Sequence, residues 1–193
     1  KNVIQDLAAL QENGLGQGIV DLAASGQSEV VGICGGYQML GQTIQDPHGL
    51  ESECSEIQGL GLLPMRTVLE PDKTLTLRQG THCLSGLPVR GYEIHHGRSQ
   101  ADHGQPVLRL DRGDDRGLAL AGEESGVWGV YLHGLFDTDH FRRWFIDRLR
   151  QRRGLAPLQQ VQARYDLEPA LDRLADVVRA SLDIDRITKE LGL

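Results

Sequence analysis

The sequence has few cysteines, and they follow no pattern. Among 193 residues only Cys34, Cys54 and Cys83 are cysteines, an odd number without C-x-x-C spacing. A disulfide framework needs paired cysteines, and a structural zinc site needs closely spaced ligands, so neither is indicated. We expect no metal site, and each thiol has to be considered by itself.

Long apolar runs and concentrated positive charge are also missing. No stretch reaches the roughly 18 to 20 apolar residues of a membrane span, and no charged-then-apolar leader opens the chain. The formal net charge is −7, whereas a nucleic-acid partner needs a basic face. Asp147 and several apolar residues interrupt the basic run Arg142–Arg153, which we interpret as the solvated side of an amphipathic helix. We therefore expect a cytoplasmic protein with neither a membrane nor a nucleic acid as its partner.

The periodicity of apolar residues predicts alternating strands and helices. "KNVIQDLAALQENG" is helical with Asn2 as a cap, "SEVVGI" is a buried strand, and "GYQMLGQTIQ" is a second helix. Residues 60–120 indicate antiparallel or mixed strands separated by Gly, Pro and Asp turns. The apolar strand "GVWGVYLHG" ends at His133, a helix over 137–154 stops at Gly154, and residues 169–193 are helical in two pieces.

A cysteine stands where the first strand gives way to a helix. Gly32, Cys34 and Gly36 form a G-x-C-x-G pattern, which is a nucleophile elbow with Cys in place of Ser. The following helix would direct its positive end at the sulfur, and the Gly35 N–H would bind an oxyanion when the thiolate adds to a carbonyl. By itself the pattern is equally compatible with a small buried cysteine in a glycine-rich turn.

A cysteine nucleophile needs a partner that handles protons, and position separates the seven histidines. His133 would project from the carboxyl edge of a strand, where open α/β sheets build their sites. His140 lies in the first turn of an amphipathic helix and is expected at the surface. The histidines in turn-like contexts are expected to be solvated, and they are His48, His82 and His103. His95 and His96 are consecutive on a strand and face opposite ways, so one of them could enter the site or serve a structural role.

Three motifs in order resemble a known family. "GICGGYQMLG", "GYEIHHGRS" and the distant "YLHGLFD" resemble the glutamine-hydrolysing domain of the class I, or triad, amidotransferases, in the branch that serves cobalamin synthesis and peptidoglycan amidation. "GLGLLPMRTVL" and "GYEIHHGRS" resemble the cobyric acid synthases more than their relatives. The resemblance implies an α/β fold with a mixed, largely parallel central sheet flanked by helices, lacking its first strands, over residues 1–193, with a helical extension from about residue 165.

The resemblance also implies roles for particular residues. Cys34 would attack the side-chain amide of glutamine, Gly35 would stabilise the oxyanion, and His133 would protonate the leaving ammonia and then activate water. Gln38 would contact the substrate, or it is simply a polar residue on the first helical turn. Tyr37 is a further substrate-binding candidate.

The acid that orients the histidine in many triad enzymes is absent. In those enzymes the residues after the histidine are Pro-Glu, whereas Gly134 and Leu135 follow His133 here. A Cys–His dyad results, in which a backbone carbonyl or another acid has to fix the imidazole. Glu93 and Asp137 are candidates for that acid, and a structural role is open for both.

The ammonia is expected to be used elsewhere. No G-x-x-x-x-G-K-[ST] loop occurs, so we expect no cofactor in this domain. The resemblance implies a missing N-terminal synthetase domain that uses ATP and Mg²⁺ to amidate corrin-ring carboxylates, and missing upstream residues that supply a second oxyanion donor. Alternatives are the amidotransferase partner of a peptidoglycan-precursor ligase or of the a,c-diamide synthase, a non-catalytic docking module, and an ester hydrolase.

Overall fold

The computed structural model describes residues 2–111, 119–121 and 126–192 of the chain. It divides into two compact units, residues 1–160 and residues 161–193. The first unit contains α1 (Val3–Glu12), α2 (Leu15–Ala24), β1 (Val30–Ile33), α3 (Gly35–Leu40), β2 (Thr43–Gln45), β3 (Glu56–Gln58), β4 (Met65–His82), β5 (Pro88–Ala101), β6 (Gln105–Pro106), β7 (Leu108–Leu110), β8 (Ala119–Ala121), β9 (Val127–Val130), β10 (Leu132–His133), the short 3₁₀ helix η1 (Leu135–Asp137) and α4 (Asp139–Arg152). The second contains α5 (Glu168–Ser181) and α6 (Ile184–Leu191).

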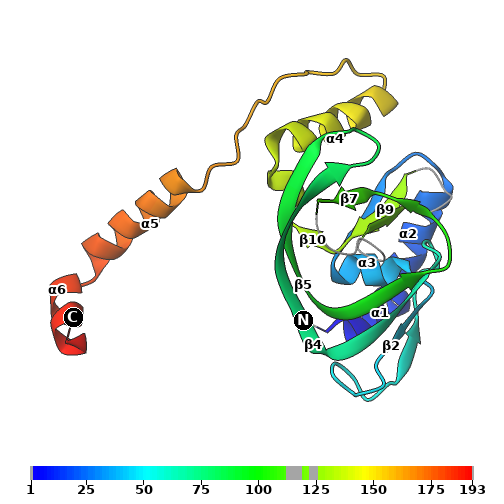
Figure 1. Ribbon diagram of the computed structural model, residues 1–193, viewed down its shortest axis with the longest axis horizontal. Helices are drawn as coiled ribbons and strands as arrows, with labels where there is room; N and C mark the ends of the chain where they lie inside the picture. Colours follow the sequence, from blue (N-terminus) through cyan, green and yellow to red (C-terminus); the bar gives the residue numbers. More distant parts are fainter. Residues whose placement is uncertain (1, 112–118, 122–125, 193) are drawn as a thin grey trace. The chain divides into compact units, whose positions relative to one another are not determined.

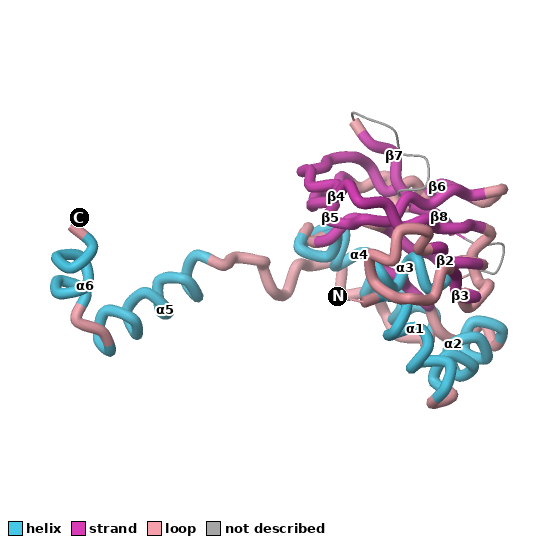
Figure 2. The backbone as a smooth tube through the Cα atoms, turned by 90° about the horizontal axis from the view of Figure 1, so that it is seen from below, coloured by secondary structure: helices cyan, strands magenta, loops and turns pink. Residues whose placement is uncertain are grey.

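The strands of the first unit form two sheets. The four-stranded sheet has the order β1-β9-β8-β6, and the six-stranded sheet has the order β10-β5-β4-β2-β3 with β7 also paired to β4. The long antiparallel strands β4 and β5 form a curved ribbon around α3 (Figure 1). Helices α1 and α2 lie together on one side of the strands (Figure 2). The expected α/β fold with a mixed sheet and flanking helices is confirmed.

The strand pairing is less parallel than we expected. Among the described residues the parallel neighbours are β1 with β9 and β2 with β4, and the other paired strands are antiparallel. The reason is local, because short turns join antiparallel strands, whereas parallel strands require a long crossover. The turn-rich stretch between residues 60 and 110 therefore forms the hairpin of β4 and β5, and β7 also pairs antiparallel with β4.

The helix after the cysteine is shorter than the apolar spacing predicted. It ends at Leu40, and Gly41 has an extended backbone with φ −69° and ψ −175°. The next residues, Thr43–Gln45, become strand β2 because they pair with β3 on one side and β4 on the other. Ile44 is fully buried, and its side chain projects from this strand rather than from a helix.

The predicted terminal helices are present. Asn2 caps α1, and its side chain accepts a hydrogen bond of 2.9 Å from the N–H of Gln5. The basic run forms the amphipathic helix α4, which buries Phe141 and Asp147. Two helical pieces follow in the second unit, as the periodicity indicated.

Asp147 joins α4 to the segment that follows it. Its carboxylate accepts hydrogen bonds from the N–H groups of Leu158 (2.8 Å) and Gln159 (3.0 Å) and from the Arg143 guanidinium (2.9 Å). Burial raises the pKa of Asp147, but these hydrogen bonds lower it by a larger amount. The net pKa therefore lies below its usual value. The carboxylate therefore stabilises the fold above the pKa of an unfolded Asp, and this stabilisation is lost as the pH falls through the lower, folded-state pKa.

We predict that Asp147→Asn lowers the urea midpoint at pH 7 and that the difference from wild type shrinks at pH 3, below the pKa of an unfolded Asp, because part of the stabilisation by the folded carboxylate is lost there. Replacement of the exposed Glu12 by Gln is the matched control and should leave both midpoints unchanged. A difference of equal size at both pH values would contradict this role for the charge.

Candidate active site

Cys34 occupies a strained turn between β1 and α3. Its φ is 54° and its ψ is −111°, a region that residues other than glycine rarely adopt and that costs about 1 to 3 kcal/mol. The backbone is held in place because the Cys34 N–H donates to the Val130 carbonyl of β9 at 2.8 Å. The Cys34 side chain is buried, and its thiol lies 3.5 Å from the carbonyl oxygen of Ile94 in β5.

The two glycines of the elbow have different reasons to be there. A Cβ atom at Gly32 would lie 2.7 Å from the Tyr37 Cα atom and from the Leu40 side chain, so the close approach of α3 to β1 requires glycine. A Cβ atom at Gly36 would meet nothing within 4 Å. Gly32 therefore permits the tight turn, while Gly36 leaves open space beside the first turn of α3.

His133 ends the short strand β10 and lies against β5, the strand that the Cys34 thiol also contacts. It is the register partner of Tyr92 in β5, and the two rings are parallel, with centroids 5.0 Å apart and an angle of 8° between their planes. A Cβ atom at Gly91 would lie 2.0 Å from the His133 carbonyl oxygen, so only glycine allows this approach. The turn after the histidine uses Gly134 at φ 74°.

The structure thus brings the predicted nucleophile and the predicted base to one strand. Cys34 contacts Ile94, and His133 stacks on Tyr92, two residues earlier in β5. Two residues of a strand span about 7 Å, so the two contact points on β5 are about that far apart. This placement follows from topology, because β9 runs parallel to β1 and the chain reaches His133 three residues after Val130.

A buried polar network holds the helix that carries Gln38. The Tyr131 hydroxyl accepts a hydrogen bond of 3.0 Å from the Gln38 amide and lies 2.6 Å from the Ser99 hydroxyl, which in turn is 2.7 Å from that of Thr67. Burial raises the pKa of Tyr131 to about 12, so the phenol stays neutral and can donate. A Cβ atom at Gly97 would lie 2.0 Å from the Gln38 amide nitrogen, so this strand position also requires glycine.

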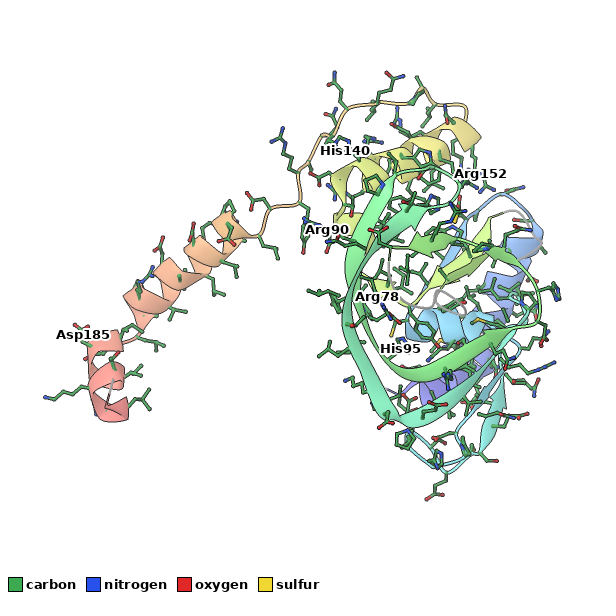
Figure 3. The ribbon with its side chains drawn as sticks, viewed as in Figure 1. Arg78, Arg90, His95, His140, Arg152 and Asp185 are labelled. Carbon is green, nitrogen blue, oxygen red and sulfur yellow. The ribbon has the colours of Figure 1, made fainter. Side chains whose placement is uncertain are left out.

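Glu93 belongs to a second polar cluster. Its carboxylate accepts a hydrogen bond from the Arg78 guanidinium, and it lies 3.0 Å from Nε2 of His95. Burial raises the pKa of Glu93, but the hydrogen bonds from His95 and Arg78 lower it by a larger amount. The net pKa is therefore below its usual value. His95 stacks on Tyr131 with ring centroids 3.7 Å apart, and Figure 3 shows it beside α3 within the curve of β4 and β5.

The candidates for orienting His133 are therefore placed as follows. The Glu93 carboxylate is engaged by Arg78 and His95. Asp137 lies in η1, where its carboxylate is 3.1 Å from the position of a Cβ atom at Gly134. The aromatic ring parallel to the His133 imidazole belongs to Tyr92, which our reading of the sequence did not single out.

A cavity of about 210 Å³ opens beside this strand. Its wall includes Ile94, whose carbonyl meets the Cys34 thiol, and Gln38, one of the predicted substrate-binding residues. Its polar lining also includes two groups of opposite charge and both neighbouring histidines: Glu51, Lys73, His95 and His96. The cavity is therefore polar. Ile94 connects it to the predicted nucleophile, because this residue lines the cavity and its carbonyl contacts the Cys34 thiol.

The other predicted residues lie close by. Gly35 is the buried first residue of α3, where helix N–H groups have no partner within the helix. Tyr37 is fully buried, with its ring edge-on to Tyr131 at 5.1 Å and against Gly129. Burial, followed by the electrostatic effect of the neighbouring Tyr131 hydroxyl, raises the pKa of Tyr37. The side chain of Tyr37 thus packs in the core behind the elbow.

Two further histidines lie outside this site. His140 is exposed on α4, as expected (Figure 3). His82, which we expected in a solvated turn, is instead buried against Phe141 and Trp144. Burial lowers the pKa of His82 to about 4, and the charge of Arg148 lowers it as well. Within the described part of the chain, no group of three His, Cys, Asp or Glu side chains gathers as a metal ion would need.

Comparison with known proteins reveals close relatives. The chain is 45% identical to the adenosylcobalamin biosynthesis bifunctional protein CobDQ of Leptospira interrogans over 100% of the chain and 22% of the relative. It is 46% identical to the cobyric acid synthase of Synechocystis (99% of the chain, 39% of the relative) and 41% identical to that of Nitratidesulfovibrio vulgaris (100% and 42%). The chain thus spans about a fifth to two fifths of the length of these relatives.

The fold and a family profile agree with these matches. A solved structure described as a glutamine amidotransferase superposes with a TM-score of 0.51 over 80% of this chain and 76% of that one, at 13% identity, which shows a shared fold. The sequence profile of the CobB/CobQ-like glutamine amidotransferase domain matches residues 1–141, almost three quarters of the chain. The chain therefore belongs to the CobB/CobQ-like glutamine amidotransferase domain family.

Proposed function

We propose that this chain is the glutaminase part of a cobyric acid synthase, which releases ammonia from glutamine for the ATP-dependent amidation of corrin-ring carboxylates. The observation that carries the proposal is the placement of Cys34, in a strained elbow, and His133 against the same strand β5. The names of the relatives support the cobalamin pathway. ATP and Mg²⁺ would act in a synthetase segment outside this chain, with the corrinoid as the acceptor, in the cytoplasm.

The reaction proceeds through a thioester on Cys34. The thiolate attacks the side-chain amide carbon of glutamine, the C–N bond breaks, and His133 gives a proton to the departing nitrogen, which leaves as ammonia. A water molecule then loses a proton to His133 and attacks the thioester, which yields glutamate and the free thiol. The Gly35 N–H stabilises the oxyanion in both steps.

The cavity beside Ile94 holds the substrate. Free glutamine carries an ammonium and a carboxylate, and the cavity carries the complementary charges of Glu51 and Lys73. Gln38 contacts the substrate from the wall of the cavity, while its hydrogen bond to Tyr131 fixes the amide. Tyr37 contributes to binding by supporting α3 from the core.

Tyr92 orients the imidazole in place of an acid. Its ring lies parallel to that of His133 at 5.0 Å, and its backbone pairs directly with the histidine. Such a stack restricts rotation of the imidazole about its side-chain bonds, which keeps a ring nitrogen directed at the reacting atoms. Tyr92 acts through His133 and is thus a positioning residue.

We predict that 6-diazo-5-oxo-norleucine, a glutamine analogue that alkylates thiols, labels Cys34 alone, because this thiol contacts Ile94, which lines the proposed glutamine cavity. Mass spectrometry of the digested protein measures the site. Cys34→Ala should abolish labelling and lower glutaminase activity by at least about 10³-fold. The matched controls are Cys54→Ala and Cys83→Ala, because both thiols are exposed, and they should behave as wild type. Labelling of another residue, or of none, would remove the basis of the proposal.

Substitutions of Tyr92 should separate its ring from its hydroxyl. We expect Tyr92→Ala to lower kcat for glutamine hydrolysis by about 10-fold or more, with a smaller effect on KM, because the imidazole loses its fixed orientation. Tyr92→Phe keeps the stack and should restore kcat. Steady-state kinetics across pH provide the measurement. A change in KM alone, or equal losses in both variants, would rule out positioning through the stacked ring.

A further inference from the structure

The two C-terminal helices present an apolar seam. Apolar residues are spaced four, three and four apart from the residue before α5 to Val178, and three and four apart in α6, so each set lies along one face of its helix. The seam, as we call it, consists of Leu167, immediately before α5, Leu171, Leu174 and Val178 in α5, and Ile184, Ile187 and Leu191 in α6.

Within the described part of the second unit, taken by itself, nothing covers the seam. Every residue of α5 and α6 is described, and none of them is buried. Leu174 is 59% exposed and Leu191 is 68% exposed. Helices of 14 and 8 residues are marginal in water when no tertiary packing supports them. Surface ion pairs such as Arg186–Glu190 contribute little to stability, so a stable helix pair needs a partner surface.

The charges of the segment argue against a membrane as that surface. Residues 161–193 contain seven acidic and five basic residues. Helices that lie on membranes carry Lys and Arg on the polar face, where they meet anionic lipids. The polar faces here carry paired charges of both signs, among them Asp176 with Arg179 at 3.2 Å and Arg186 with Glu190 at 2.9 Å.

The length of the seam argues against a coiled coil with a second copy. Such coils need three to four consecutive heptads of apolar spacing. The seam holds about two heptads in α5, and it is interrupted before α6 at Leu182, where the backbone is extended. A short, interrupted seam of this kind fits a groove on a folded surface better than it fits the same seam of a second copy.

The relatives indicate where such a surface exists. The family profile ends at residue 141, but the Leptospira and Nitratidesulfovibrio relatives align with 100% of this chain, which includes both helices. The aligned part is 22% and 42% of those proteins, so each has a large remainder. We propose that the seam of α5 and α6 docks onto the segment that precedes Lys1 in a longer chain of this kind. This docking is independent of the chemistry at Cys34.

Amide hydrogen exchange of the longer chain, measured by mass spectrometry, tests the docking. We expect residues 169–191 to exchange at least about 100-fold more slowly than unstructured peptide, because docked helices open rarely. The double variant Leu171→Gln, Leu174→Gln removes two seam residues without a large loss of helix propensity and should lose most of this protection. The matched control Asp172→Gln, Arg173→Gln changes the opposite face of the same turn and should keep it.

Several results would overturn the proposal. Unprotected helices in the wild-type longer chain would show that nothing covers the seam, and equal protection in residues 1–193 alone would identify the first unit as the partner. Protection that rises with protein concentration would identify a second copy as the partner, and protection that appears only with anionic vesicles would identify a membrane. Protection retained by the seam variant would show that other residues hold the helices. Labelling of Cys34 by 6-diazo-5-oxo-norleucine should be unchanged in both variants, so failure of this proposal is distinguishable from failure of the glutaminase proposal.

Discussion

The segment from Val127 to His133 is the constraint on which the site depends. Its first half, β9, pairs with β1 in one sheet, and its second half, β10, pairs with β5 in the other. The first pairing fixes the Cys34 backbone through the Val130 carbonyl, and the second places His133 against Tyr92. One continuous stretch of chain thus sets the positions of both the thiol and the imidazole.

Tyr131 stands at the point where this segment leaves one sheet for the other. Its ring packs between Tyr37 and His95, and its hydroxyl joins Gln38 to Ser99. A buried hydroxyl without partners would be costly, so the complete network favours a single arrangement of α3 against β5. This arrangement stabilises the strained backbone at Cys34, whose cost of about 1 to 3 kcal/mol has to be met by surrounding contacts.

The sequence predicted the parts of this site that are local. The strand before Cys34, the turn at Gly32, the strand end at His133 and the cap at Asn2 all rest on patterns within a few residues, and each is present. The parts that depend on register were not predictable. Thr67 and Ser99 meet because β4 and β5 pair in one register before a bulge, and Tyr92 meets His133 through another pairing. The apolar spacing also extended the helix beyond Gly41, because it could not show that Thr43–Gln45 had strands on both sides.

The central claim is that Cys34 and His133 form one catalytic unit beside the cavity at Ile94. A crystal structure of the protein with a glutamyl group bound to Cys34 as the thioester measures this directly. We predict an imidazole nitrogen within about 4 Å of the sulfur, or joined to it through one water at a longer distance, with the amino-acid end of the substrate between Glu51 and Lys73. An imidazole directed away from the sulfur, or a thioester whose amino-acid end lies outside that cavity, would contradict it.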